Sequence, residues 1–182
     1  MIGNIKIILG PMFSGKSSEI IRLINRYKIL NKKILAINHE IDNRYGENKI
    51  ISHNKEKIDC INLKNLKPIM ETEDYKNSEV IVIEEAQFFP DLFEFVVTSA
   101  DKYHKNIIVA GLDGDYQKKP FGDLLRLIPH AESVVKLHAL CLKCNDGTKA
   151  AFTKRIIDND KKILVGSSEN YQPVCRKHFL ED

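Results

Sequence analysis

A short segment near the start of the chain has the spacing of a phosphate-binding loop. The segment GPMFSGKS fits the pattern G-x4-G-K-[ST], and it stands between an apolar run and a helical pattern, as this motif requires. Its glycines let backbone N–H groups surround phosphates, and the N-terminus of the next helix adds partial positive charge. Lys16 would reach the terminal phosphates, and the Ser17 hydroxyl would bind Mg²⁺. The pattern therefore predicts binding of a nucleoside triphosphate, the alternative being a glycine turn with only a structural role. The candidate nucleotide-binding residues are Gly10, Pro11, Met12, Phe13, Ser14, Gly15, Lys16 and Ser17.

Two adjacent acidic residues, Glu84 and Glu85, follow the apolar run VIVI at 80–83. A carboxylate at the end of such a strand can face a metal ion, which is the form of a Walker-B element. Side chains alternate along a strand, so two neighbours point in different directions. One carboxylate can therefore serve Mg²⁺, while the other lies within hydrogen-bond reach of a substrate hydroxyl and acts as a general base. The alternative is that one of the pair is only a solvated surface charge.

A third group of chemically competent residues lies near the C-terminus. Cys141 and Cys144 form a C-x2-C knuckle. After 30 intervening residues, Cys175 and His178 form a C-x2-H knuckle. Two such knuckles can converge on one ion, and the arrangement fits a tetrahedral Cys3His zinc site. The alternatives are unligated thiols or a redox pair, and His138 is a rival ligand with less regular spacing.

Composition and charge restrict the class of protein. Of the 182 residues, 43% are hydrophobic and 29% are charged, so a packed core is feasible in one domain with a small appendage. The net charge of +3 is too small to indicate, by itself, binding to nucleic acid or to a membrane surface. No apolar run approaches the roughly 20 residues that cross a bilayer, and the start lacks a secretory signal. We therefore expect a cytoplasmic protein with reduced thiols, in which Cys60 is a small half-buried residue.

Alternating strands and helices must position these residues. Short apolar runs rich in β-branched residues predict strands, and apolar residues at helical spacing predict helices. The expected strands are 5–9, 33–38, 80–83, 106–111 and 133–137, and the expected helices are 17–30, 63–71, 90–103 and 123–130. This alternation implies an α/β fold, with a parallel sheet and right-handed crossovers.

Two other segments differ in character from this alternation. Residues 39–57 are polar throughout and are expected to form a loop. Beyond Cys141 the two knuckles bracket a basic segment without periodicity. We therefore expect a nucleotide-binding domain at 1–140 and a zinc-binding domain at 141–182.

Several segments, in order along nearly the whole chain, resemble the type II thymidine kinases, the cellular and poxviral group. They are GPMFSGKS at 10–17, DNRYG at 42–46, QFFPD at 87–91, LDGDYQKKPFG at 112–122, FTKR at 152–155 and the tail at 171–178. The resemblance implies Mg²⁺-dependent transfer of the ATP γ-phosphoryl group to the 5′-hydroxyl of thymidine, and also of deoxyuridine. It further implies a P-loop, RecA-like domain, a small zinc-stabilised lasso domain, and a homotetramer inhibited by dTTP.

The resemblance implies roles for individual residues. Glu85 matches the catalytic base of the family's Asp-Glu pair. Glu84 stands at the metal-associated Asp position, where it keeps the charge on a side chain one methylene longer. His178 matches a zinc ligand that is Cys in animal and poxviral members, and zinc accepts either. Arg44 and Arg155 are candidates for stabilising the transferred charge, the alternative being surface arginines.

The resemblance also implies a nucleoside pocket. Tyr116 replaces the commoner Phe, which adds a hydroxyl that needs a partner or water. Lys162 stands where an apolar residue is common, so its side chain is expected to point outward. The residues that match the pocket walls are Met12, Phe88, Leu112, Tyr116 and Phe121. The residues that match the lasso over the base are Thr153, Lys162, Ile163, Leu164, Val165, Gly166 and Tyr171.

Two other functions compete with a nucleoside kinase. A P-loop ATPase that couples hydrolysis to movement or assembly would use its base to activate water. A non-enzymatic zinc ribbon would bind nucleic acid, but the tail lacks a concentrated basic patch with interleaved aromatic residues. The basic segment FTKR is followed within a few residues by the acidic segment DND at 158–160. We therefore expect small-molecule substrates and neither nucleic acid nor membrane as a partner.

Overall fold

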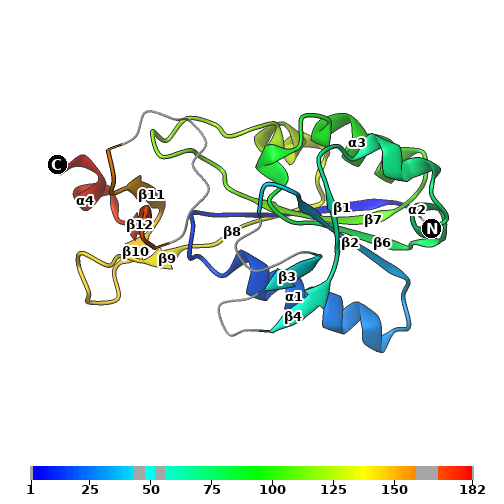
Figure 1. The fold of residues 1–182 in the computed structure, drawn as a ribbon, viewed down its shortest axis with the longest axis horizontal. Helices are drawn as coiled ribbons and strands as arrows, with labels where there is room; N and C mark the ends of the chain where they lie inside the picture. The colour runs from blue at the N-terminus through cyan, green and yellow to red at the C-terminus, as the bar shows by residue number, and fades with distance from the viewer. Residues whose placement is uncertain (1, 43–47, 52–55, 159–167, 182) are drawn as a thin grey trace.

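The computed structural model describes residues 2–42, 48–51, 56–158 and 168–181. Its centre is a six-stranded sheet in the order β5-β2-β6-β7-β1-β8, and every neighbouring pair of strands runs parallel (Figure 1). The strands are β1 (Asn4–Leu9), β2 (Ile34–His39), β5 (Ile61–Leu63), β6 (Val80–Ile83), β7 (Asn106–Gly111) and β8 (Ser133–Lys136). The expected α/β fold with a parallel sheet is therefore confirmed.

Helices cover both faces of this sheet. The two long ones, α1 (Lys16–Ile29) and α3 (Leu92–Asp101), pack on opposite faces (Figure 1). In β1, Ile5 and Ile7 face α3, whereas Ile8 faces α1, because successive side chains of a strand alternate. Strands buried on both faces have apolar residues at every position, which explains the continuous apolar runs of the sequence.

Shorter helices connect these elements. They are η1 (Lys67–Glu71), α2 (Glu73–Asn77), η2 (Ala86–Phe88) and η3 (Leu124–His130), of which α2 is α-helical and the others are 3-10 helices. The helix expected at 63–71 is therefore wrong in extent, because η1 covers only Lys67–Glu71. Leu63 ends β5 because it pairs with His39 of β2, and the turn starts only where Leu66 and Lys67 donate their backbone N–H groups to Asp91.

The expected loop at 39–57 is also wrong in part. The described residues of this segment include β3 (Lys49–Ile51), which forms an antiparallel hairpin with β4 (Lys57–Asp59). Ile50 and Ile58 are opposite each other in this hairpin, and both pack on the core under α1. Two apolar residues in a polar segment are enough to attach a hairpin to the core, although they give no periodic signal.

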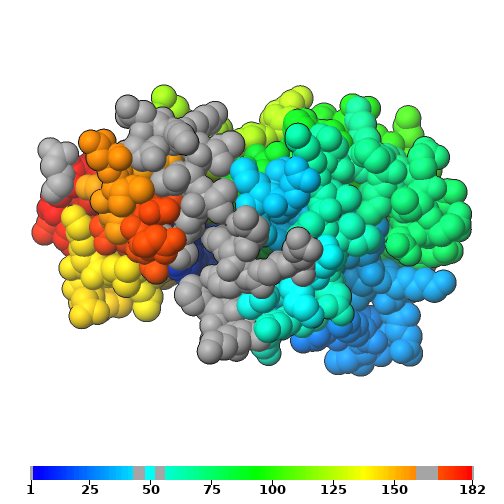
Figure 2. Space-filling model, viewed as in Figure 1, coloured from blue at the N-terminus to red at the C-terminus, as the bar shows by residue number. Residues whose placement is uncertain are grey.

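The C-terminal residues build a second, smaller layer at one end of the molecule (Figures 1 and 2). Its elements are β9 (Ala139–Leu140), β10 (Lys149–Ala150), β11 (Phe152–Arg155), β12 (Tyr171–Val174) and α4 (Arg176–Leu180), with β9 paired to β10 and β11 paired to β12. It has a small core of its own around Ala139, Cys141, Ala150 and Val174. Phe13 of the N-terminal loop packs on this core, so the two regions are in contact.

The helices of the described residues are all too short or too polar to span a bilayer.

Candidate active site and metal centre

The loop between β1 and α1 has the geometry of a phosphate cradle. Gly15 has φ 84°, a conformation that favours glycine, and no atom lies within 4 Å of the position of a Cβ there. Helix α1 begins at Lys16 without a side-chain cap, so its first N–H groups keep their donor capacity. Lys16 Nζ donates to the carbonyl oxygens of Gly10 and Pro11, at 3.2 and 2.9 Å, which holds the ammonium group inside the loop. This arrangement fits a triphosphate at a helix N-terminus.

Glu84 links the end of β6 to the phosphate loop. The Ser17 hydroxyl donates to Glu84 Oε1 at 2.8 Å, so helix α1, which follows β1, contacts the end of β6, although β7 lies between these two strands. Glu84 is only 5% exposed, and its Oε2 has no hydrogen-bond partner among the described residues. Burial and the neighbouring charge of Glu85 raise the pKa of Glu84 to about 8. A buried carboxylate beside a serine hydroxyl is a donor set that suits Mg²⁺, whose charge would favour the ionised carboxylate.

Glu85 departs from the strand geometry directly after Glu84. Its φ of 52° and ψ of 37° lie in the left-handed region, which is uncommon for a residue with a side chain. The side chain of Glu85 is half-buried, and Gln87 Nε2 donates to its Oε2 at 2.6 Å. Strained backbone of this kind is typical of functional positions. The two acidic residues thus have different surroundings, because the chain leaves the strand conformation at Glu85 and not because strand side chains alternate.

Two pairs of residues of the predicted nucleoside pocket are in direct contact. The rings of Phe88 and Phe121 meet edge to face, with centroids 5.4 Å apart. The backbone N–H of Met12 donates to Thr153 Oγ1 at 3.0 Å, which ties the phosphate loop to β11. Leu112, another predicted pocket residue, donates its backbone N–H to Gln87 Oε1 at 3.0 Å.

Two further predicted pocket residues, Tyr116 and Tyr171, contact Arg155. The Arg155 guanidinium lies 3.7 Å from the centre of the Tyr116 ring and donates to the Tyr171 hydroxyl at 2.9 Å. The Tyr116 hydroxyl accepts a hydrogen bond from Gln117 at 3.3 Å, which supplies the partner that this extra hydroxyl needs. Arg155 therefore joins the loop at 112–122 to β12, and its role toward transferred charge stays a prediction.

Some predicted site residues lie outside the described residues. They are Arg44 and the lasso residues Lys162, Ile163, Leu164, Val165 and Gly166.

The four predicted zinc ligands converge on one point. His178 Nδ1 lies 3.4 Å from the sulfurs of Cys141 and Cys144 and 3.5 Å from that of Cys175, and the last two sulfurs are 3.7 Å apart. Tetrahedral ligation by zinc would separate two sulfurs by about 3.8 Å, and a sulfur and a nitrogen by about 3.5 Å. The cluster therefore fits a structural zinc ion.

The four-residue cluster favours ionisation of one of its cysteines, Cys141, whereas burial raises the pKa of Cys144. Burial opposes ionisation of Cys141, but hydrogen bonds at Cys175, Cys144 and His178 lower its pKa to about 6. The thiolate that zinc prefers is then available at neutral pH. The rival ligand, His138, is exposed and is not part of the cluster. Cys60 is fully buried rather than half-buried, and burial raises the pKa of its thiol to about 12.

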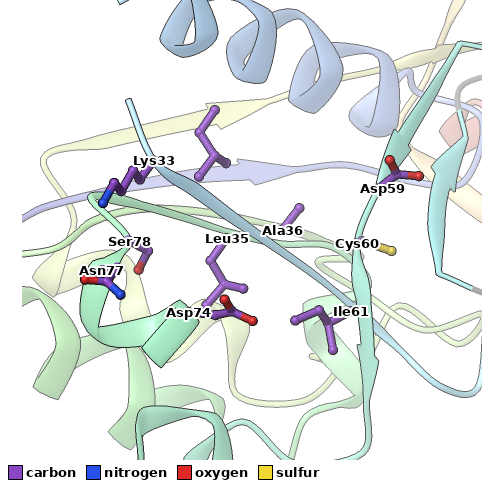
Figure 3. Close-up of a pocket in the computed structure, with 10 residues that line it drawn as sticks. Lys33, Leu35, Ala36, Asp59, Cys60, Ile61, Asp74, Asn77 and Ser78 are labelled. Atoms are coloured by element: carbon purple, nitrogen blue, oxygen red, sulfur yellow. The ribbon is translucent and has the colours of Figure 1, made fainter. Parts of the chain in front are cut away.

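A separate cavity of about 450 Å³ lies beside the first half of β2 (Figure 3). Lys33, Leu35 and Ala36 line it from β2 and the residue before it, and Asp74 and Asn77 line it from α2. None of the predicted site residues that the structure describes lines it. In parallel sheets ligands bind at the carboxyl ends of the strands, whereas this cavity lies toward the amino end of β2. It is therefore not the nucleotide site.

Gln87 is a site residue that the sequence interpretation did not assign. It lies in the segment QFFPD, two positions after Glu85, and that position inside a conspicuous motif is the signal that pointed to it. Its contacts with Glu85 and Leu112 become visible only in the fold.

The comparisons with known proteins agree with this geometry. The family model described as thymidine kinase matches residues 3–179. The thymidine kinase of vaccinia virus (strain Western Reserve) is 42% identical over 179 residues, which cover 98% of both chains. The thymidine kinase of variola virus (isolate Human/India/Ind3/1967) is 42% identical over the same length and coverage. The thymidine kinase of Oryza sativa subsp. japonica is 40% identical over 183 residues, covering 98% of this chain and 67% of the plant protein. The chain belongs to the thymidine kinase family.

Proposed function

We propose that the protein phosphorylates thymidine, transferring the γ-phosphoryl group of ATP to the 5′-hydroxyl and giving dTMP for nucleotide salvage. The observation that supports this most directly is the convergence of three features at one edge of the sheet. The phosphate loop, the Ser17–Glu84 pair and the strained Glu85 all lie at the carboxyl ends of β1 and β6. Membership of the thymidine kinase family supplies the substrate.

The phosphate loop would hold the triphosphate for transfer. Phosphoryl transfer requires mainly positioning and neutralisation of charge. The N–H groups at the start of α1 and the Lys16 ammonium would surround the terminal phosphates. Ser17 and Glu84 would hold Mg²⁺, which supplies positive charge to the phosphate oxygens.

Glu85 would act as the general base. Its carboxylate would accept a hydrogen bond from the 5′-hydroxyl and take the proton as the 5′-oxygen bonds to the γ-phosphorus. The bond from the γ-phosphorus to the β–γ bridging oxygen breaks, and ADP leaves with that oxygen. The two acidic residues would thus have different roles: Glu85 would face the nucleoside, and Glu84 would face the metal ion.

The pocket beside Glu85 would select the base. Met12, Phe88, Leu112, Tyr116, Phe121, Thr153 and Tyr171 would form it, together with residues 162–166. Thymine carries an N3–H donor that a buried acceptor can bind, whereas cytosine would leave that acceptor unpaired at a cost of about 1–3 kcal/mol. We therefore expect activity on thymidine and deoxyuridine and little activity on deoxycytidine.

The C-terminal region would act as a lid domain held by zinc. We propose a boundary between domains at 1–140 and 141–182, with zinc on Cys141, Cys144, Cys175 and His178 anchoring both ends of the segment between the knuckles. Zinc would do no chemistry there and would stabilise a region with few apolar residues. By analogy with the family, we also propose a cytoplasmic homotetramer inhibited by dTTP.

One assay tests the function. ADP release from ATP and Mg²⁺ is measured with each of the four deoxynucleosides and with none. We expect release to depend on thymidine, with thymidine phosphorylated at the 5′-position. Release that is independent of nucleosides would instead indicate a P-loop ATPase, and the absence of release under all conditions would favour a binding protein.

A further inference from the structure

We propose that Gln87 is a positioning residue for Glu85, and that it couples this base to the loop at 112–122 that walls the nucleoside pocket. The inference rests on the proposed function, because it assigns a task to Gln87 within the same site. Gln87 lies in η2, two positions after Glu85, and the residue is 4% exposed.

The two ends of the Gln87 carboxamide contact two different parts of the site. Its Oε1 accepts the backbone N–H of Leu112 at 3.0 Å, and its Nε2 donates to Glu85 Oε2 at 2.6 Å. A backbone N–H can only donate, and an ionised carboxylate can only accept. The orientation of the amide is therefore fixed by its partners, and neither contact survives if the amide is flipped.

Glycines at both ends of the loop leave room for Gln87. A Cβ on Gly111, the last residue of β7, would lie 2.5 Å from Gln87 Oε1. A Cβ on Gly122, which has φ 62°, would lie 2.3 Å from the backbone oxygen of Gln87. Gln87 is thus packed against both ends of the loop at 112–122. A shift of Gln87 would therefore move the loop, and a shift of the loop would move Gln87.

This arrangement has a consequence for catalysis. The donated hydrogen bond fixes the rotamer of Glu85 and so the position of the carboxylate that takes the proton. The accepted hydrogen bond fixes the start of the pocket wall relative to the base. A nucleoside that orders the loop therefore also orders the carboxylate that its 5′-hydroxyl must meet.

Two substitutions separate the two contacts of Gln87. Gln87→Glu keeps an oxygen for the Leu112 N–H and removes the donor to Glu85, whereas Gln87→Met removes both contacts at similar size. Gln172→Met is the matched control, because Gln172 is a half-buried residue of β12 without a contact to Glu85. The measurements are kcat, the KM values for thymidine and ATP, and the thermal unfolding midpoint.

We expect Gln87→Glu to lower kcat by about tenfold to a hundredfold with the thymidine KM within threefold of the wild-type value. Gln87→Met lowers kcat similarly and also raises the thymidine KM by about fivefold or more. The ATP KM stays within twofold in both variants, and Gln172→Met behaves as wild type.

Two results would overturn the proposal. One is a kcat of Gln87→Glu within twofold of wild type. The other is a parallel loss of kcat, ATP affinity and thermal midpoint in Gln87→Glu, which would indicate a merely structural residue. If Gln87→Met does not fold, Gln87→Glu alone decides, since it preserves the shape of the side chain. Failure of the proposed function is distinguishable, because wild-type ADP release would then not depend on thymidine.

Discussion

The sheet region and the C-terminal region differ in how much apolar surface each can bury. The sheet region has two apolar layers, one on each face, in which most strand residues are fully buried. Among the residues that the structure describes, the core of the C-terminal region consists of four buried residues, one of which is the predicted zinc ligand Cys141. A small apolar core supplies little stability, and structural metals commonly supply the rest. The comparison predicts that the two regions respond differently to metal removal and to substitution.

Removal of zinc is expected to have the largest effect. Chelation or Cys175→Ser should lower thymidine-dependent turnover by about 10³ or more, because zinc binding supplies much of the folding free energy of the C-terminal region. Binding of a fluorescent ATP analogue should persist, since the phosphate loop belongs to the sheet region. Cys60→Ser is the control, because Cys60 is buried far from the cluster in sequence and packs under α1. Equal loss of nucleotide and nucleoside binding would contradict the division between the regions.

Glu85→Gln is expected to have the next largest effect. The amide cannot take the proton of the 5′-hydroxyl, so kcat should fall by about 10² or more. The dissociation constant of ATP should change little, because Glu85 does not belong to the phosphate loop. Steady-state kinetics and titration with an ATP analogue check both statements, with the exposed Glu94→Gln as the control. Turnover near the wild-type value would remove Glu85 from the role of base.

Lys105→Met tests the stability of the sheet region alone. Lys105 Nζ donates to the backbone oxygens of Tyr75, Lys76 and Ser78, at 2.9, 3.0 and 2.6 Å. Loss of these bonds leaves the carbonyl groups of Lys76 and Ser78 without this donor, whereas that of Tyr75 still accepts from Ser78. It should lower the free energy of unfolding by about 2 kcal/mol. Denaturant unfolding measures the change, and the exposed Lys102→Met is the control. Zinc affinity should stay unchanged, and a parallel loss of zinc would show that the regions unfold as one unit.

Arg155→Met is expected to have the smallest effect. It removes the stacking on Tyr116 and the hydrogen bond to Tyr171, so the thymidine KM should rise by about threefold to tenfold, with kcat and the ATP KM nearly unchanged. Arg22→Met, which removes a surface ion pair with Glu19, is the control. A loss of kcat with an unchanged thymidine KM would instead place Arg155 on the transferred phosphoryl group.

The sheet was predictable from the sequence because its strands are continuous apolar runs. The runs that became β1, β6 and β7 lie within one residue of their expected bounds. The hairpin of β3 and β4 was not predictable, since its few apolar residues, Ile50, Ile51 and Ile58, stand among polar ones without the periodicity of a strand. The helix expected from residue 63 starts only at Lys67, because its start depends on Asp91, which is distant in sequence.

The site was predictable where its residues are adjacent or regularly spaced. The phosphate loop and the cysteine knuckles are of this kind. In the structure, the Lys16 ammonium group lies against its own loop, and the four Cys and His side chains of the knuckles converge. The contact of Gln87 with Leu112 and that of Arg155 with Tyr116 join residues far apart in the chain. No local pattern encodes such pairs, because the turns between them decide which side chains meet.

The contact between the phosphate loop and the C-terminal core limits how these enzymes can be recombined. The Met12 backbone N–H donates to Thr153, and Phe13 packs on the small core, so the segment proposed to bind ATP contacts the region proposed to cover the nucleoside. A chimaera that takes its tail from a relative would join surfaces that have not been fitted to each other. Exchange of the tail is therefore expected to preserve function only when residues 12 and 13 are transferred with it.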